Sequence, residues 1–142
     1  MATGTSLSSY LEAQILNWAK GAAFVGAPVT LYAALYTVDP TDASASGTEV
    51  VGNAYARVAI TSSTGWSAIT DGGKGVGASI TNAGVITYPT PTAAWGTVGW
   101  FALYDAATVG NSIYADALTL SKIINSGDTV SFAVGAISIA VD

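Results

Sequence analysis

A helical hydrophobic pattern opens the chain. Between residues 7 and 20, apolar side chains recur at spacings of four, four and three residues, which is the period of an amphipathic α-helix. The side chains on this stripe are Leu7, Leu11, Ile15 and Trp18. Such a stripe either closes the protein's own core or docks onto another subunit. The sequence therefore marks these four residues as a candidate interface.

The ends of this helix carry recognisable signals. Ser6 is one candidate N-cap; alternatively, Ser9 and Glu12 form a Ser-x-x-Glu capping box and the helix begins one turn later. Lys20 lies in the last turn, where a basic side chain is favourable, and Gly21 follows as a stop signal. The pattern thus predicts one N-terminal helix with defined ends.

From residue 29 the hydrophobic period changes to two, which is the period of a β-strand. Residues 29–38 and 97–104 are the richest runs, and both of their alternating faces are apolar. Such runs are typical of strands that are buried on both sides. The tripeptide Ala-Leu-Tyr occurs in both runs, at 34–36 and at 102–104. This repeat marks equivalent strands of a pseudo-symmetric sandwich, or it arises by chance in a chain rich in these residues.

Shorter strand patterns, separated by turn signals, fill the rest of the chain. A Gly- and Ser-rich stretch at 62–79 indicates a hairpin tip or a loop. About seven or eight short strands indicate an all-β fold, a β-sandwich or jelly-roll-like single domain over residues 1–142 with the sandwich over 29–142. A barrel with the helix at one end is the alternative. The shorter strands cover residues 49–60 with a bulge at 52–53, 85–88, 112–118, 122–124, 129–134 and 136–141.

Composition narrows the function more than it narrows the fold. The 142 residues include no His, no Cys, 4 Lys+Arg and 9 Asp+Glu, and 51% of them are hydrophobic. The charged fraction is 9%, whereas ordinary globular proteins have about 25%. A net charge of -5 argues against binding to nucleic acid, because phosphates require a basic surface. A surface so poor in charge indicates extensive contacts between subunits.

The sequence offers neither a membrane span nor a signal peptide. A spanning helix needs about 20 consecutive apolar residues. The richest candidate, residues 22–38, is interrupted by Gly26 and Pro28. The first ten residues contain no basic side chain, unlike the start of a secretory signal. We therefore expect no membrane association.

Catalytic patterns are also missing. Without His or Cys, the usual nucleophile–base pairs and metal-ligand sets cannot form. Two carboxylate pairs, Asp39/Asp42 and Asp105/Asp116, lie in or beside predicted turns, where Asp is favoured because it hydrogen-bonds its own backbone. We therefore expect no catalytic residue, no metal and no cofactor.

Trp66 is the remaining candidate for binding. It lies in the Gly-rich stretch 62–79, and loop tips rarely bury their side chains. An exposed Trp can stack on a sugar or anchor an interface. The sequence therefore favours Trp66 as an exposed binding aromatic, with a host glycan as a candidate ligand; the alternative is that it packs in the sandwich core.

Several segments resemble a family of small virion structural proteins of tailed bacteriophages, often labelled tail fibre proteins. They follow one another in the family's order and extend over nearly the whole chain, from residue 7 to residue 141, although the stretch 62–79 departs from the family pattern. The segments are Leu31–Asp42 (LYAALYTVDPTD), Gly47–Val50 with Tyr55–Arg57 (GTEV, YAR), Trp95–Val98 with Ala102–Ala107 (WGTV, ALYDAA), and Ala117–Thr119 with Lys122 and Ile124–Thr129 (ALT, K, INSGDT).

The resemblance implies a non-enzymatic, β-rich virion component that works as an oligomer. The expected partners are copies of the chain itself, for example in a trimer, and other virion proteins. The expected location is the virion, assembled in the host cytoplasm. Within this class, a tail or fibre protein is favoured, and a capsid decoration protein that stabilises the head shell is the alternative; a host-glycan-binding adhesin module is a further one.

Overall fold

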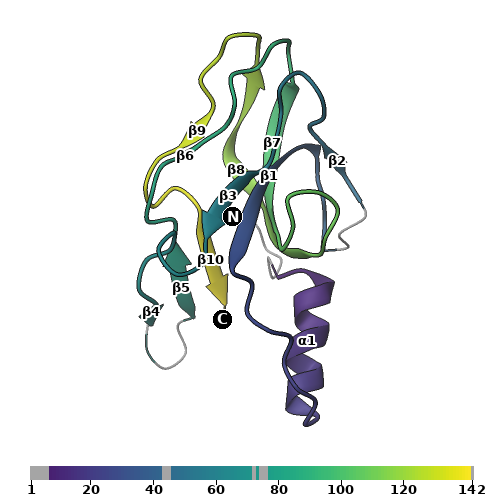
Figure 1. Cartoon of the computed structure of the whole chain (residues 1–142), viewed down its shortest axis with the longest axis vertical. Coiled ribbons are helices and arrows are strands. Elements are labelled where there is room, and N and C mark those ends of the chain that lie inside the picture. Colours follow the sequence, from purple (N-terminus) through teal and green to yellow (C-terminus); the bar gives the residue numbers. More distant parts are fainter. Residues whose placement is uncertain (1–6, 43–45, 72, 74–76, 142) are drawn as a thin grey trace.

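The computed structural model describes residues 7–42, 46–71, 73 and 77–141. It contains one short N-terminal helix, and its strands pair in antiparallel sheets (Figure 1). The predicted all-β class with a single N-terminal helix is therefore confirmed.

The main sheet is built around two long strands. β1 (Thr30–Val38) pairs along one edge with β7 (Gly96–Tyr104), which in turn pairs with β8 (Ser112–Ile124). Two short strands share the other edge of β1: β2 (Thr48–Glu49) covers its end and β3 (Val58–Thr61) covers its start. The two strongest strand patterns of the sequence thus form the centre of the sheet.

Two small sheets lie against one face of the main sheet. One has the order β10 (Ser138–Val141), β5 (Ala78–Thr81), β4 (Thr70–Asp71), and the other joins β6 (Ile86–Thr87) to β9 (Ser131–Phe132) (Figure 1). Side chains of these small sheets and of the main sheet meet in one core, which gives the layered arrangement of a sandwich. The buried residues of this core are Leu31, Ala33, Leu35, Val50, Ile60, Ile86, Tyr88, Trp95, Val98, Phe101, Leu103, Tyr114, Ile124 and Ile137.

The opposite face of the main sheet carries a second, smaller cluster. Ala34 and Tyr36 of β1 are buried there beside Ala102 and Tyr104 of β7. Ala34 lies directly opposite Ala102 in the ladder, and the hydroxyls of Tyr36 and Tyr104 are hydrogen-bonded at 2.6 Å. The repeated Ala-Leu-Tyr therefore marks two neighbouring central strands with equivalent faces.

The predicted strand over residues 49–60 is wrong in its middle. The chain leaves the sheet after β2 and returns only at β3. Between them, Gly52, Asn53 and Ala54 have φ values of 71°, 51° and 67°, which is left-handed backbone that no strand adopts. A loop, and not a bulge, therefore joins the two short strands.

β8 is continuous, whereas the sequence predicted two strands separated at 119–121. The register with β7 shifts in that region: Val98 lies opposite Lys122, but Trp100 lies opposite Ala117. The partners are two positions apart on β7 and five positions apart on β8, so β8 accommodates three extra residues there. This bulge keeps β8 paired on both sides of it.

The helix α1 (Ser9–Ala19) is shorter than predicted at both ends. Its N-cap is Ser8, whose Oγ accepts a hydrogen bond from the Leu11 N–H at 3.2 Å; the predicted Ser9–Glu12 capping box is therefore one residue out of register, and Ser6 lies outside the described residues. Gly21 ends the helix as predicted, with φ 90°. No helix among the described residues is long and apolar enough to cross a membrane.

Candidate functional site

The face of α1 that the sequence marked as an interface is not part of the core. The helix extends beyond the ends of the strands at one end of the molecule (Figure 1), and none of its residues is buried. Ile15 is 39% exposed and Trp18 is 62% exposed. Leu11 is half-buried, and Leu7 lies before the helix, where it pairs with Tyr114 of β8 and packs against the main core.

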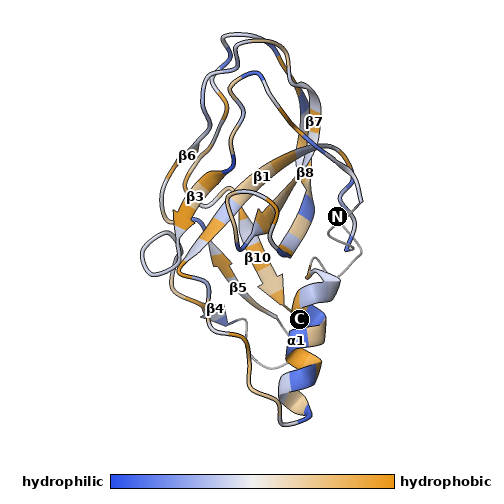
Figure 2. Ribbon diagram, turned by 45° about the vertical axis from the view of Figure 1, so that its right-hand side comes forward, coloured by the Kyte–Doolittle hydropathy of each residue, from blue (hydrophilic) through white to orange (hydrophobic). Residues whose placement is uncertain are grey.

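The helix faces the rest of the molecule with the side that carries Leu11, so only part of the predicted stripe remains free. Tyr10, Leu11 and Gln14 line a groove of about 260 Å³ together with the extended segment 24–28. This side leaves Leu16, which is 66% exposed, outside the contact. Figure 2 shows hydrophobic and hydrophilic residues alternating along α1. The stripe predicted from the sequence missed Leu16, because only the position of the helix against the body shows which side remains free.

Trp66 is half-buried, so the prediction of an exposed binding aromatic is wrong in that respect. The residue forms a bridge to Asn82, and its ring packs against the main core. Its indole Nε1 is buried without a hydrogen-bond partner. The predicted loop folds back at this point, since the Ser67 N–H donates to the Thr81 carbonyl at 2.8 Å. A ring held in this way has little surface for stacking on a sugar.

Asn82 joins two segments of the chain, 82–84 and 133–137, from a buried position. Its Nδ2 donates to the carbonyl oxygens of Gly84 at 2.7 Å and Ala133 at 2.8 Å. Its Oδ1 accepts from the Ile137 N–H at 2.8 Å. The bond to the Ile137 N–H is itself buried, so it satisfies a donor that is shielded from water. The amide thus ties β5 to the turn that precedes β10.

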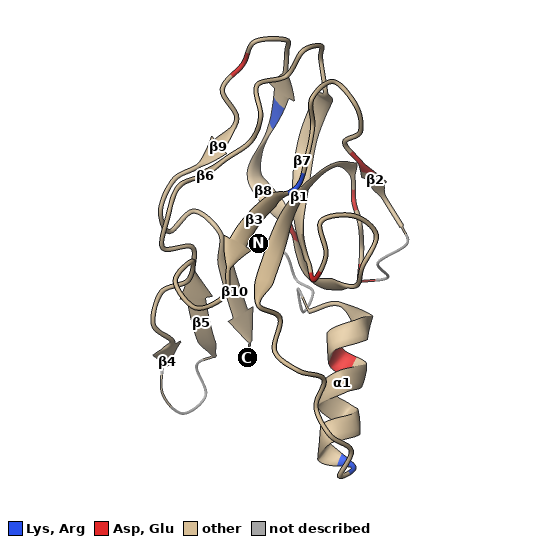
Figure 3. Cartoon of the chain, viewed as in Figure 1, with Lys and Arg blue, Asp and Glu red and all other residues tan. Residues whose placement is uncertain are grey.

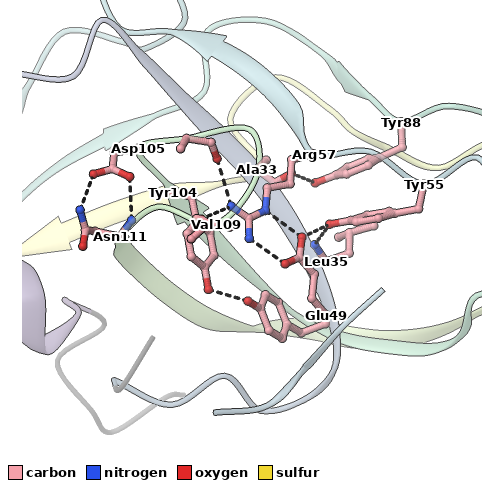
Figure 4. Close-up of polar contacts among 12 residues, drawn as sticks. Ala33, Leu35, Glu49, Tyr55, Arg57, Tyr88, Tyr104, Asp105, Val109 and Asn111 are labelled. Atoms are coloured by element: carbon pink, nitrogen blue, oxygen red, sulfur yellow. Dashed lines mark hydrogen bonds and ion pairs between the residues drawn. The ribbon is translucent and has the colours of Figure 1, made fainter. Parts of the chain in front are cut away.

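A second polar centre surrounds Arg57 on the other face of the main sheet (Figure 4). The guanidinium and the carboxylate of Glu49 form a two-point ion pair, with Nε–Oε1 at 2.8 Å and Nη2–Oε2 at 2.7 Å. Nη1 donates to the carbonyl oxygens of Ala106 at 3.0 Å and Val109 at 2.8 Å. The guanidinium carbon also lies 3.7 Å from the centre of the Tyr104 ring. Arg57 therefore fixes the loop between β7 and β8 against the sheet.

Buried tyrosines extend this network. The Tyr55 hydroxyl donates to Glu49 Oε1 at 2.9 Å and accepts from the Leu35 N–H at 2.9 Å. Burial raises the pKa of Tyr55 and of Tyr36 far above the usual range, and the hydrogen bond from Tyr104 adds to the increase for Tyr36. Burial also raises the pKa of Tyr88, whose hydroxyl donates to the Ala33 carbonyl at 3.0 Å. Burial alone would lower the pKa of Arg57, but Glu49 raises it above its ordinary value.

These pKa shifts predict a loss of stability at high pH. Tyrosines in the unfolded chain ionise near pH 10, whereas Tyr36, Tyr55 and Tyr88 keep their protons in the folded state. The free energy of unfolding should therefore fall as the pH rises above about 10, because ionisation stabilises only the unfolded state. Urea unfolding at increasing pH measures this fall. The expectation fails if all seven tyrosines ionise near pH 10 while the circular dichroism remains that of the folded protein.

Three of the four aspartates in these predicted pairs accept hydrogen bonds from nearby backbone N–H groups. Asp39 accepts from the Thr41 N–H, and Asp105 accepts from the N–H and the side-chain amide of Asn111, as predicted for turn residues. Asp116 differs from the prediction, because it lies within β8 and accepts from the Ala117 N–H. Among the residues that the structure describes, no three Asp or Glu side chains are close enough to hold a metal ion.

The site that remains for function is thus an exposed apolar helix on a body held together by internal polar contacts. A scan against family models matches residues 6–140 to the family described as podophage GP4 fiber I protein gp80. No curated protein matches the chain. The match confirms the resemblance seen in the sequence, and the chain belongs to this family of phage fibre proteins, which are structural proteins of the virion.

Proposed function

We propose that this chain is a non-enzymatic subunit of a phage tail fibre that assembles through contacts with its own copies and with a larger virion protein. The family match supports the fibre assignment. The observation that carries the assembly role is the helix α1, whose large apolar side chains are exposed at one end of the molecule. Apolar surface of this kind is normally covered by a partner.

The distribution of charge supports the same role. Figure 3 shows that Lys, Arg, Asp and Glu are scattered over the helix, strands and loops, with long stretches of the chain that carry neither sign. The centres of protein interfaces are depleted in charged residues. A subunit that neighbours cover over much of its surface needs few charged side chains, because little of that surface faces water in the assembled particle.

Labelling on intact particles tests the location. An antibody against the chain, or a fused tag, should decorate fibres at the tail when virions are viewed by electron microscopy. Label spread over the head shell at quasi-symmetric positions would instead establish the capsid decoration role and contradict the proposal. Virions labelled with an antibody against an unrelated protein provide the control for background decoration.

A further inference from the structure

We propose that a groove at the side of the sandwich, between β8 and β9, binds a small amphipathic anion: an alkyl chain that carries one carboxylate. The residues that line this groove are not those that line the groove beside α1. The site therefore lies outside the surface proposed for assembly, and its ligand is separate from the partners of a fibre subunit.

The groove reaches the main core from the outside. Its volume is about 410 Å³, and small-molecule sites commonly have volumes of about 300 to 1,000 Å³. Its floor is formed by Leu35, Val98, Phe101 and Ile124, all of which belong to the buried core. Such a floor offers apolar contact to a ligand but no hydrogen bond from a side chain, so it favours a hydrocarbon chain.

The bulge of β8 supplies one wall of the groove. The bulged region carries Leu118, Thr119 and Leu120, and all three line the groove. Val130 and Phe132, in and beside β9, line it from the other sheet. Leu120 is 82% exposed, so a large apolar side chain stands beside the groove without covering it. Bulges commonly redirect side chains next to functional sites, and here the bulge coincides with the opening in the core.

One cation reaches the groove from the core side of the main sheet. Lys122 lies directly opposite Val98 in the ladder between β8 and β7, so both side chains leave the sheet on the same face. Val98 is buried in the floor, whereas Lys122 is exposed. The apolar stem of the lysine therefore lies along the groove while its ammonium group remains in water at the mouth.

The charge of Lys122 is available to a ligand. Among the described residues that line the groove, Lys122 alone is charged, and it forms no ion pair within the described part of the chain. Asp116 and Asp128, six positions to either side, do not line the groove. The hydroxyls of Thr119 and Thr129 also line it and can donate hydrogen bonds. This combination suits a carboxylate at the mouth and a hydrocarbon chain over the floor.

A series of straight-chain carboxylates tests the apolar half of the site. From hexanoate through octanoate to decanoate, affinity should rise about two- to fourfold for each added methylene, because each one removes further apolar surface from water. Isothermal titration calorimetry measures the affinities, and changes in amide chemical shift should concentrate at residues 117–122 and 129–132. The proposal is wrong if decanoate shows no saturable binding up to about 10 mM, or if the shifts centre elsewhere.

Lys122→Met tests the charged half of the site, and Lys20→Met is its matched control. Both lysines are exposed, but Lys20 is the C-cap of α1. Lys122→Met should weaken octanoate binding about three- to tenfold and leave octanol binding unchanged, because octanol has no charge to pair. Lys20→Met should alter neither affinity. An equal loss for octanoate and octanol in Lys122→Met would contradict the proposed ion pair.

Ala136→Trp fills the groove, and Ala68→Trp is its matched control. Both alanines are exposed, but only Ala136 lines the groove. Ala136→Trp should abolish decanoate binding while its circular dichroism stays that of the parent chain, and Ala68→Trp should bind as the parent does. Unchanged affinity in a folded Ala136→Trp variant would overturn the proposal. Binding of the parent chain to anionic lipid vesicles without affinity for free decanoate would also overturn it, in favour of a membrane surface.

Discussion

Replacement of Arg57 by methionine is expected to destabilise the fold by about 2 to 4 kcal/mol, because removing one partner of a partly buried ion pair leaves the other charge uncompensated. Methionine keeps much of the apolar stem but loses both bonds to Glu49 and both bonds to the loop carbonyls of Ala106 and Val109. Urea unfolding followed by circular dichroism measures the loss.

Two further variants help to interpret this result: one separates the charge of Arg57 from its geometry, and the other is a control outside the network. Arg57→Lys keeps the positive charge but not the planar fork, so an intermediate loss is expected. Lys122→Met removes a cation from an exposed position on β8 and should change stability by less than about 0.5 kcal/mol. Equal stability of Arg57→Met and the parent chain would show that the network contributes nothing to folding.

Replacement of Asn82 by alanine is the other change with a large expected effect, a loss of about 3 to 5 kcal/mol. The substitution removes three hydrogen bonds and leaves the N–H of Ile137 buried without its partner, while the partly buried carbonyls of Gly84 and Ala133 each lose one bond. Because these groups lie on different segments, β5 and β10 should separate first. Amide hydrogen exchange should show the earliest loss of protection in these two strands.

Asn111→Ala is the matched control for Asn82→Ala. Asn111 is exposed, and its side chain donates one hydrogen bond to Asp105 at 2.8 Å. The expected loss is about 1 kcal/mol or less, since water can replace this bond. If Asn82→Ala were no more destabilising than Asn111→Ala, the buried amide would not be what joins residues 82–84 to residues 133–137.

The sequence predicted the central strands because their alternation is strong and local. β1 and β7 are apolar on both faces, and the structure buries both faces. The predicted helix was correct as an element for the same reason. Its burial could not be derived, because a periodic pattern shows which side chains share a face and not what lies opposite them.

The two polar centres, around Asn82 and around Arg57, could not be predicted from the sequence for a different reason. The partners of Asn82 are backbone groups, two of them 51 and 55 residues away, and no residue type marks them. Arg57 and Glu49 are only eight residues apart, which is a detectable signal. The sequence nevertheless predicted one continuous strand there. On a single strand of that length the two side chains would lie too far apart for an ion pair.

The bulge of β8 also limits how copies of this protein can join. β8 is the last named strand of the main sheet, and residues 7 and 8 cover its edge only near Ile113 and Tyr114. An outer strand with uncovered backbone groups can recruit a strand from a neighbour. The three extra residues disturb the spacing that such recruitment requires. We therefore expect the bulge to hinder edge-to-edge pairing of β8 with another strand.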